Sequence, residues 1–326
     1  MSVIAGLADL YGTMVRIVGR CAVATGFGAM TLLPLPSHAD QAVPLPVNEV
    51  APGVFVHEAP IALANESNLG AIANLGFVIG RDGVAIIDTG GSLAAGERLL
   101  AAIRQRTTQP IRYVINTHMH PDHILGNAAF KAGGVTFVGH QNLPRALADR
   151  EKAYLAANSG LIGASFRGTE IVPPTLLVAG TVELDLGNRR LRVEAWRTAH
   201  TNTDITVLDL ATGTWFLGDL LFMGHLPALD GSLTGWIRTV RDLRSRPAAR
   251  VVPGHGPSTA PWPEAAAPME KYLTRLADDV RSSIRTGHTI SEAAQQAARS
   301  EAGAWLLFNE FNPRNATAAF HELEWE

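Results

Sequence analysis

Short apolar runs bounded by glycine and other turn residues recur along most of the chain. Runs of this length, rich in Val, Ile, Leu and Phe, are typical of buried strands. The predicted strands are at residues 53–58, 74–80, 83–91, 111–117 and 135–139, several within 175–219, and 249–256.

Apolar residues at helical spacing occupy the segments between and after these runs. The predicted helices are at residues 92–105, from 122 onward, 141–157, 232–245 and 269–287. Thr289 with Glu292 forms a capping box that predicts one more helix, through residue 298. Strand-rich halves with helices between and after them predict an α/β (α+β) fold with two sheets, each covered by helices on its outer face.

Composition and charge narrow the class of protein. Hydrophobic residues make up 47% of the 326 residues and charged residues 17%, which is typical of a folded globular protein. The net charge is −3 without a long basic block, so we expect no nucleic-acid partner. Because no linker divides residues 40–326, they are predicted to form a single domain.

The first 39 residues differ in character from the rest. Arg16 and Arg20 precede a weakly apolar stretch at 21–36, and Ser37-His38-Ala39 follows it. A positive segment, an apolar segment and a small-x-small site are the layout of a secretory signal peptide. The alternatives are a frayed helix or a short membrane anchor, but the stretch is too short and too interrupted for a comfortable membrane span.

Export has consequences for the mature chain. Cleavage near Ala39/Asp40 predicts a periplasmic or secreted protein without a stable membrane span, whether translation starts at Met1 or at Met14. It would also remove Cys21, the only cysteine. Disulfides and thiolate ligands are then excluded, so a metal would have to be held by nitrogen and oxygen atoms.

Histidines and an aspartate crowd the segment that follows the predicted strand at 111–117. They are His118, His120, Asp122 and His123. The cluster is either a histidine-rich polar turn or half of a metal site. His118 and His120, two positions apart on an extended backbone, would point the same way and reach one ion.

Other predicted strands also end in metal-ligand residues: His200, Asp219 and His255. Together with the cluster after residues 111–117, they make four strand ends with possible ligands, which favours the metal site over the polar turn. One ion would be held by His118, His120 and His200, and a second by Asp122, His123 and His255, with Asp219 as the bridge. Imidazole and carboxylate ligands fit two Zn²⁺ ions per chain, with iron and manganese as alternatives.

The same residues carry a resemblance to a known family. The motifs are IIDTG at 86–90, THMHPDH at 117–123, AH at 199–200, GD at 218–219 and GHG at 254–256. The chain resembles the metallo-β-lactamase superfamily, which implies a four-layer αββα sandwich, a dinuclear site between the sheets and the seven ligands given above. The resemblance also implies that Asp88 supports the site from behind the ligands.

Individual positions point to a branch of that superfamily. His120 in place of an acid argues against the di-iron flavoproteins. The zinc β-lactamases carry cysteine or serine at the position of Asp219. With aspartate there, the ligand set resembles that of glyoxalase II. The basic residues with which that enzyme binds glutathione have no match here. The stretches 227–237 and 314–326 resemble the periplasmic quinoprotein-relay zinc metallohydrolases, related to proteins that accompany sulfur oxidation, which implies a quinoprotein dehydrogenase as a partner.

The predicted function is therefore an exported dinuclear zinc hydrolase. A metal-bound hydroxide would attack an acyl, ester or thioester carbonyl of a small-molecule substrate, and Asp122 would orient the nucleophile and receive a proton. Three alternatives stay open: a β-lactam-hydrolysing enzyme, a sulfur or persulfide oxidoreductase with one iron on His118, His200 and Asp219, and a non-enzymatic periplasmic carrier of a metal or cofactor.

Residues that contact the substrate are harder to predict. His225 is expected in a loop over the metals, and Asn202 is expected to face the pocket. The pocket walls are expected from the loops at 56–73 and 158–176.

Overall fold

The first sheet has seven strands in sequence order. The computed structural model describes residues 42–326, so the predicted signal peptide lies outside the described residues. The strands are β1 (Asn48–Ala51), β2 (Val54–His57), β3 (Leu75–Ile79), β4 (Val84–Ile87), β5 (Ile111–Ile115), β6 (Thr136–His140) and β7 (Leu176–Val178). Pairing is antiparallel from β1 to β4 and parallel from β4 to β7.

The second sheet has five strands in the order β12-β11-β10-β9-β8. They are β8 (Thr181–Asp185), β9 (Arg190–Ala195), β10 (Ile205–Asp209), β11 (Thr214–Phe222) and β12 (Arg250–His255). Only the β11–β12 pair in this sheet is parallel. The strand runs read from the sequence thus divide between two sheets.

Alternating side chains place the two sheets face to face. In β4, Ala85 and Ile87 belong to a core that also contains Val207 and Phe216 of the second sheet. Ile86, between them, belongs to a separate core with helix residues on the other side of the first sheet. Since successive strand residues point to opposite faces, both faces of the first sheet are buried.

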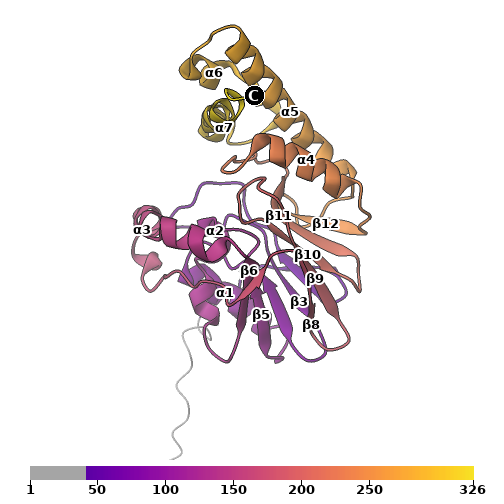
Figure 1. The fold of residues 1–326 in the computed structure, drawn as a ribbon. Coiled ribbons are helices and arrows are strands. Elements are labelled where there is room, and N and C mark those ends of the chain that lie inside the picture. Colours follow the sequence, from indigo (N-terminus) through magenta and orange to yellow (C-terminus); the bar gives the residue numbers. More distant parts are fainter. Residues whose placement is uncertain (1–41) are drawn as a thin grey trace, which may run out of the picture. The chain divides into compact units, whose positions relative to one another are not determined.

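Helices cover the outer faces of both sheets (Figure 1). They are α1 (Leu93–Arg104), α2 (Pro121–Ile124), α3 (Leu143–Ile162), α4 (Leu233–Arg244), α5 (Ala267–Arg285), α6 (Ile290–Gln296) and α7 (Phe308–Leu323). α1 packs on the first sheet, and α4 and α5 pack on the second. α6 and α7 pack on α5 and on each other. The Ser92 and Ser232 hydroxyls cap α1 and α4, and the predicted Thr289–Glu292 capping box begins α6.

A buried ion pair ties the two sheets together. Arg189 donates to both carboxylate oxygens of Asp209 at 3.0 and 2.7 Å, and its third nitrogen donates to the Ile79 carbonyl of the first sheet at 3.0 Å. Burial by itself raises the pKa of Asp209, but hydrogen bonds from Arg189 and Thr212 bring that pKa below its usual value.

The predicted α/β fold with two helix-covered sheets is confirmed. α3 runs to Ile162, five residues beyond the predicted helix, and α7 was not predicted as a helix. The described residues all fall in one compact unit, while the predicted boundary at residue 40 stays a prediction. Within residues 42–326, none of the helices combines the length and hydrophobicity needed to span a bilayer.

Candidate metal centre

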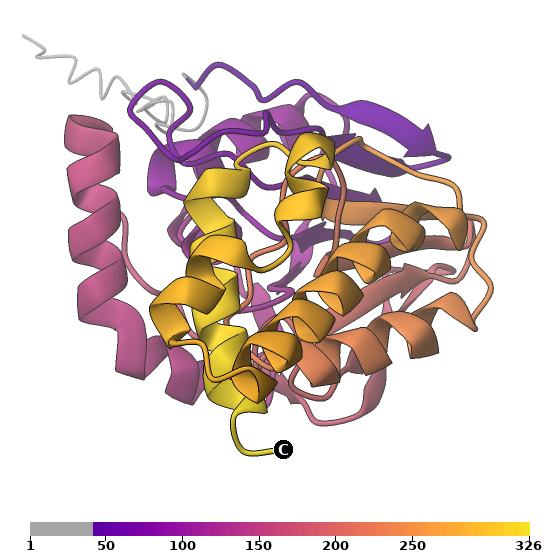
Figure 2. The same ribbon diagram turned by 90° about the horizontal axis from the view of Figure 1, so that it is seen from above.

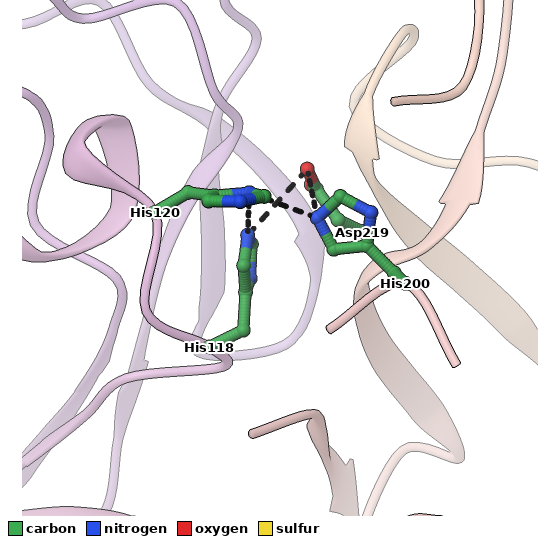
Figure 3. Close-up of side chains that lie close together, drawn as sticks. All are labelled: His118, His120, His200 and Asp219. Carbon is green, nitrogen blue, oxygen red and sulfur yellow. Dashed lines mark hydrogen bonds and ion pairs between the residues drawn. The ribbon is translucent and has the colours of Figure 1, made fainter. Parts of the chain in front are cut away.

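Three histidines and an aspartate converge from three segments that are far apart in the sequence (Figure 3). His118 and His120 follow β5, and His200 follows β9. The His120 Nδ1 atom lies 3.1 Å from His118 Nε2 and 3.0 Å from His200 Nε2. Asp219 Oδ2 lies 3.6 Å from His118 Nε2 and 3.4 Å from His200 Nε2. One ligand atom from each side chain lies within 4.8 Å of the others, so one cation can contact all four.

A second group lies beside the first and shares Asp219 with it. Asp122, His123 and His255 bring one ligand atom each within 4.8 Å of the others. Asp219 Oδ1 lies 3.3 Å from His123 Nε2, and Asp219 Oδ2 lies 3.5 Å from His255 Nε2. The Asp219 carboxylate therefore faces both groups.

The backbone around Asp219 differs from the expected strand end. Asp219 lies inside β11, which continues to Phe222, so its predicted place after the strand is wrong. The register between β11 and β12 shifts at Gly218, whose φ is +52°, and such an irregularity re-aims the side chain that follows. Gly254 in β12 leaves the space for that carboxylate, because a Cβ there would meet Asp219 Oδ1 far inside van der Waals distance.

Asp88 fixes the orientation of His123, a member of the second group. Its Oδ2 lies 2.8 Å from His123 Nδ1 and accepts from the Thr117 hydroxyl at 2.7 Å, while its Oδ1 accepts from the Thr117 amide at 2.8 Å. These contacts fix the His123 ring with Nε2 toward Asp219. Asp88 has a φ of +59°, which a non-glycine residue rarely adopts and which is common at functional sites.

The first group is also held by outer contacts. His200 Nδ1 lies 2.6 Å from the Ala228 carbonyl, which leaves Nε2 for a ligand. His120 Nε2 lies 3.2 Å from Asp230 Oδ2, which leaves Nδ1. The segment that carries Ala228 and Asp230 therefore orients two of the three histidines.

Burial and neighbouring charges shift the pKa values of the cluster in opposite directions. Burial lowers the pKa of His200 to about 3 and that of His118 well below its usual value, so both rings are neutral. Burial also lowers the pKa of His123, but nearby carboxylates, Asp219 foremost, raise it well above the usual value. The neutral rings of His118 and His200 have free lone pairs beside the Asp219 carboxylate, and such a donor set suits a cation.

Unpaired buried atoms supply an independent test of that fit. In the part of the chain that the structure describes, His123 Nε2 and Asp219 Oδ1 are buried and lie 3.3 Å apart, but neither has a hydrogen-bond partner. Leaving buried polar atoms unpaired is costly, and a bound cation would satisfy both atoms at once. The residues present therefore fit a metal.

A cavity of about 400 Å³ opens over the cluster. His225 lines it, as expected, with its ring 4.8 Å from that of His255. Asn202 does not line it. Asn202 is exposed, because the buried Thr201 and Thr203 on either side of it take the inward positions of the turn.

Two helices supply cavity residues that the sequence analysis missed. From α3 come Arg150 and Tyr154, and from α7 come Phe311 and Arg314. Of the expected loop at 158–176, Asn158 alone lines the cavity, and it belongs to α3. The α3 residues recur at helical spacing, which could have placed them on one face but not over this site. The expected loop at 56–73 does contribute to the wall.

Comparisons with known proteins agree with this geometry. The family model described as the metallo-beta-lactamase superfamily matches residues 70–255. A linear primary-alkylsulfatase from Pseudomonas sp. (strain ATCC 19151) is 37% identical over 68 residues, which are 19% of this chain and 13% of that relative.

Solved structures show the same fold. A metallo-beta-lactamase from Pontibacter korlensis aligns with a TM-score of 0.57 and 23% identity, over 71% of this chain and 99% of its own. The stereoselective inverting sec-alkylsulfatase Pisa1 from Pseudomonas sp. aligns with a TM-score of 0.63 and 15% identity, over 84% of this chain and 49% of its own.

The chain belongs to the metallo-β-lactamase superfamily, because the family model matches more than half of it. This confirms the predicted family and its αββα fold. Together with the cluster of histidines and aspartates, membership defines the class as a metal-dependent hydrolase.

Proposed function

We propose that the chain is a dinuclear metal hydrolase that acts on a small acyl, ester or thioester substrate. The supporting observation is the Asp219 carboxylate, which faces two adjacent groups of ligand atoms. His118, His120 and His200 would hold one ion, and Asp122, His123 and His255 the other. Imidazole and carboxylate ligands of this kind suit zinc, which we take as the metal, with iron and manganese as alternatives. When bound, the ions would supply Lewis acidity at the scissile bond and lower the pKa of a water molecule.

The residues of the chain perform the other steps. Asp122 faces the cavity, and its pKa is low because the charges of His123 and His255 outweigh the effect of burial. An ionised Asp122 would orient the attacking water and accept its proton. Asp88 and the Ala228 carbonyl keep the rings in place during turnover, since neither contact needs to change.

A sulfate ester of an alkyl chain is the second candidate substrate. It is favoured by the 68-residue match to the linear primary-alkylsulfatase. The test is a screen of one metal-loaded preparation against carboxyl esters, thioesters, alkyl sulfates and β-lactams. We expect ester-type turnover that is lost on chelation and restored by zinc, with weak β-lactam cleavage because Asp219 stands where the zinc β-lactamases carry cysteine or serine. A protein that binds metal but cleaves none of these classes would contradict the proposal and favour the carrier alternative.

Export and a quinoprotein dehydrogenase partner remain part of the proposal. Export is supported by the pattern of residues 1–39, and the partner only by the resemblance of residues 227–237 and 314–326. These two stretches contact each other. Asn315 donates to the Pro227 carbonyl at 2.6 Å, and Glu322 accepts from the Ser232 hydroxyl at 2.8 Å. Their contacts position the segment of Ala228 and Asp230, which orients His200 and His120.

A further inference from the structure

The cavity over the cluster has an apolar wall. Leu63 and Ile72 come from the loop before β3, Leu229 from the segment before α4, and Phe311 from α7. Leu63 is 49% exposed, so part of this apolar wall lies where solvent reaches it. A wall of this kind suits the hydrocarbon part of a small ligand.

Two arginines from different helices line the same cavity. Arg150 comes from α3 and Arg314 from α7, and in Figure 2 the yellow C-terminal helix lies next to α3, which is at the left of the view. Arg150 lies 3.7 Å from Asp230, the carboxylate that contacts His120. Arg314 is exposed and has no ion pair with any residue between 42 and 326. At least one guanidinium is thus free to bind a ligand.

The charges of the cavity favour an anion once the proposed ions are counted. Two dications would outweigh the ligand carboxylates Asp122 and Asp219. Of the remaining lining charges, Arg150 and Arg314 exceed Asp230 by one positive charge. The planar guanidinium group donates two parallel hydrogen bonds to a pair of oxygens, and both carboxylate and tetrahedral sulfate-type groups offer such a pair.

We infer that this site takes an anionic amphiphile: an apolar chain or ring that carries a sulfate-type or carboxylate head group. Arg150 and Arg314 bind the head group, and the wall of Leu63, Ile72 and Phe311 binds the apolar part. This inference deepens the proposed function and rests on it for the chemistry at the metals. Binding, however, can be measured without turnover, so the two can fail separately.

The test is calorimetric titration of the metal-loaded protein with hexane-1-sulfonate and with the uncharged methyl hexyl sulfone. We expect the sulfonate to bind at least about tenfold more tightly than the sulfone, with an affinity that falls as salt is added. Heptanoate in a parallel titration separates a carboxylate preference from a sulfate-type preference, and tight binding of either anion supports the inference. Equal affinity for the charged and uncharged ligands would overturn it.

Variants assign the preference to the arginines. Arg150→Gln and Arg314→Gln should each weaken the anion about tenfold and leave the sulfone unchanged. Arg238→Gln is the matched control, because Arg238 is exposed on α4 and does not line the cavity. If both variants keep the full preference for the anion, the metals alone select the ligand and the role given to the arginines is wrong.

Discussion

Replacing Gly254 by alanine tests how closely β11 and β12 must approach each other for the site to form. The added Cβ would lie 2.8 Å from the Gly218 carbonyl carbon and 2.9 Å from the Asp219 nitrogen, and closer still to Asp219 Oδ1. Real Cβ atoms essentially never approach other atoms within 3.0 Å. Because two of these neighbours are backbone atoms, a side-chain rotation cannot relieve the overlap. Asp219 must move, and with it the carboxylate that faces both groups of ligands.

A displacement of about 1 Å in a catalytic group costs on the order of 100-fold in rate. We therefore expect Gly254→Ala to lose at least about 100-fold in turnover and to retain less metal after dialysis. Gly160→Ala is the control: a Cβ at this position of α3 meets nothing within 4 Å, and alanine is the better helix former. The measurements are metal content by mass spectrometry and turnover on one responsive substrate, with circular dichroism to confirm folding. A folded Gly254→Ala protein with the metal content and turnover of the wild type would refute the packing argument.

Three further predictions concern other parts of the chain. Asp88→Asn should weaken metal affinity about 10- to 100-fold, measured by chelator competition, because its imidazole partner loses a charged acceptor; unchanged affinity would contradict the role of Asp88. Asp209→Asn should lower the free energy of unfolding by about 3 kcal/mol at neutral pH, because it breaks a buried ion pair. The folded-state pKa of Asp209 lies below the unfolded value, so this stabilisation is present above about pH 4 and is lost as the pH falls through the folded-state pKa. The free energies of unfolding of the two proteins, measured in urea, should therefore converge in acid. A difference that stays constant with pH would contradict the assignment. N-terminal sequencing of the mature protein should begin near Asp40, and a product that keeps the first 39 residues would contradict export.

The ligands were predictable from the sequence because strand ends carry local signals. An apolar run followed by His118 and His120 places both rings at a sheet edge, and His255 follows the same rule at the end of β12. The strands were predictable for the same reason, since each apolar run lies between turn residues. Both faces of β3 and β4 are buried, so these strands appear as continuous apolar runs. β1 was not predicted, because Asn48 and Glu49 are polar and exposed.

The remaining features depend on contacts between distant segments. The place of Asp219 inside β11 follows from a register shift against β12, which no local pattern reveals. Asn202 faces outward because of the turn made by its neighbours. Arg150 and Arg314 line one cavity only because α3 and α7, which are far apart in the sequence, both border it. Helical spacing assigns residues to a face of a helix but does not say what that face meets.

The most direct test of the dinuclear assignment is the metal content per chain of the wild type and Asp219→Ala, purified without added metal and analysed by mass spectrometry beside turnover. We predict about two zinc ions per chain in the wild type. In Asp219→Ala we predict about one, held by His118, His120 and His200, with turnover at least about 100-fold lower, a loss on the order of 3 kcal/mol in transition-state stabilisation. A wild type with a single iron, or an Asp219→Ala protein with two tightly bound zinc ions and undiminished turnover, would contradict it.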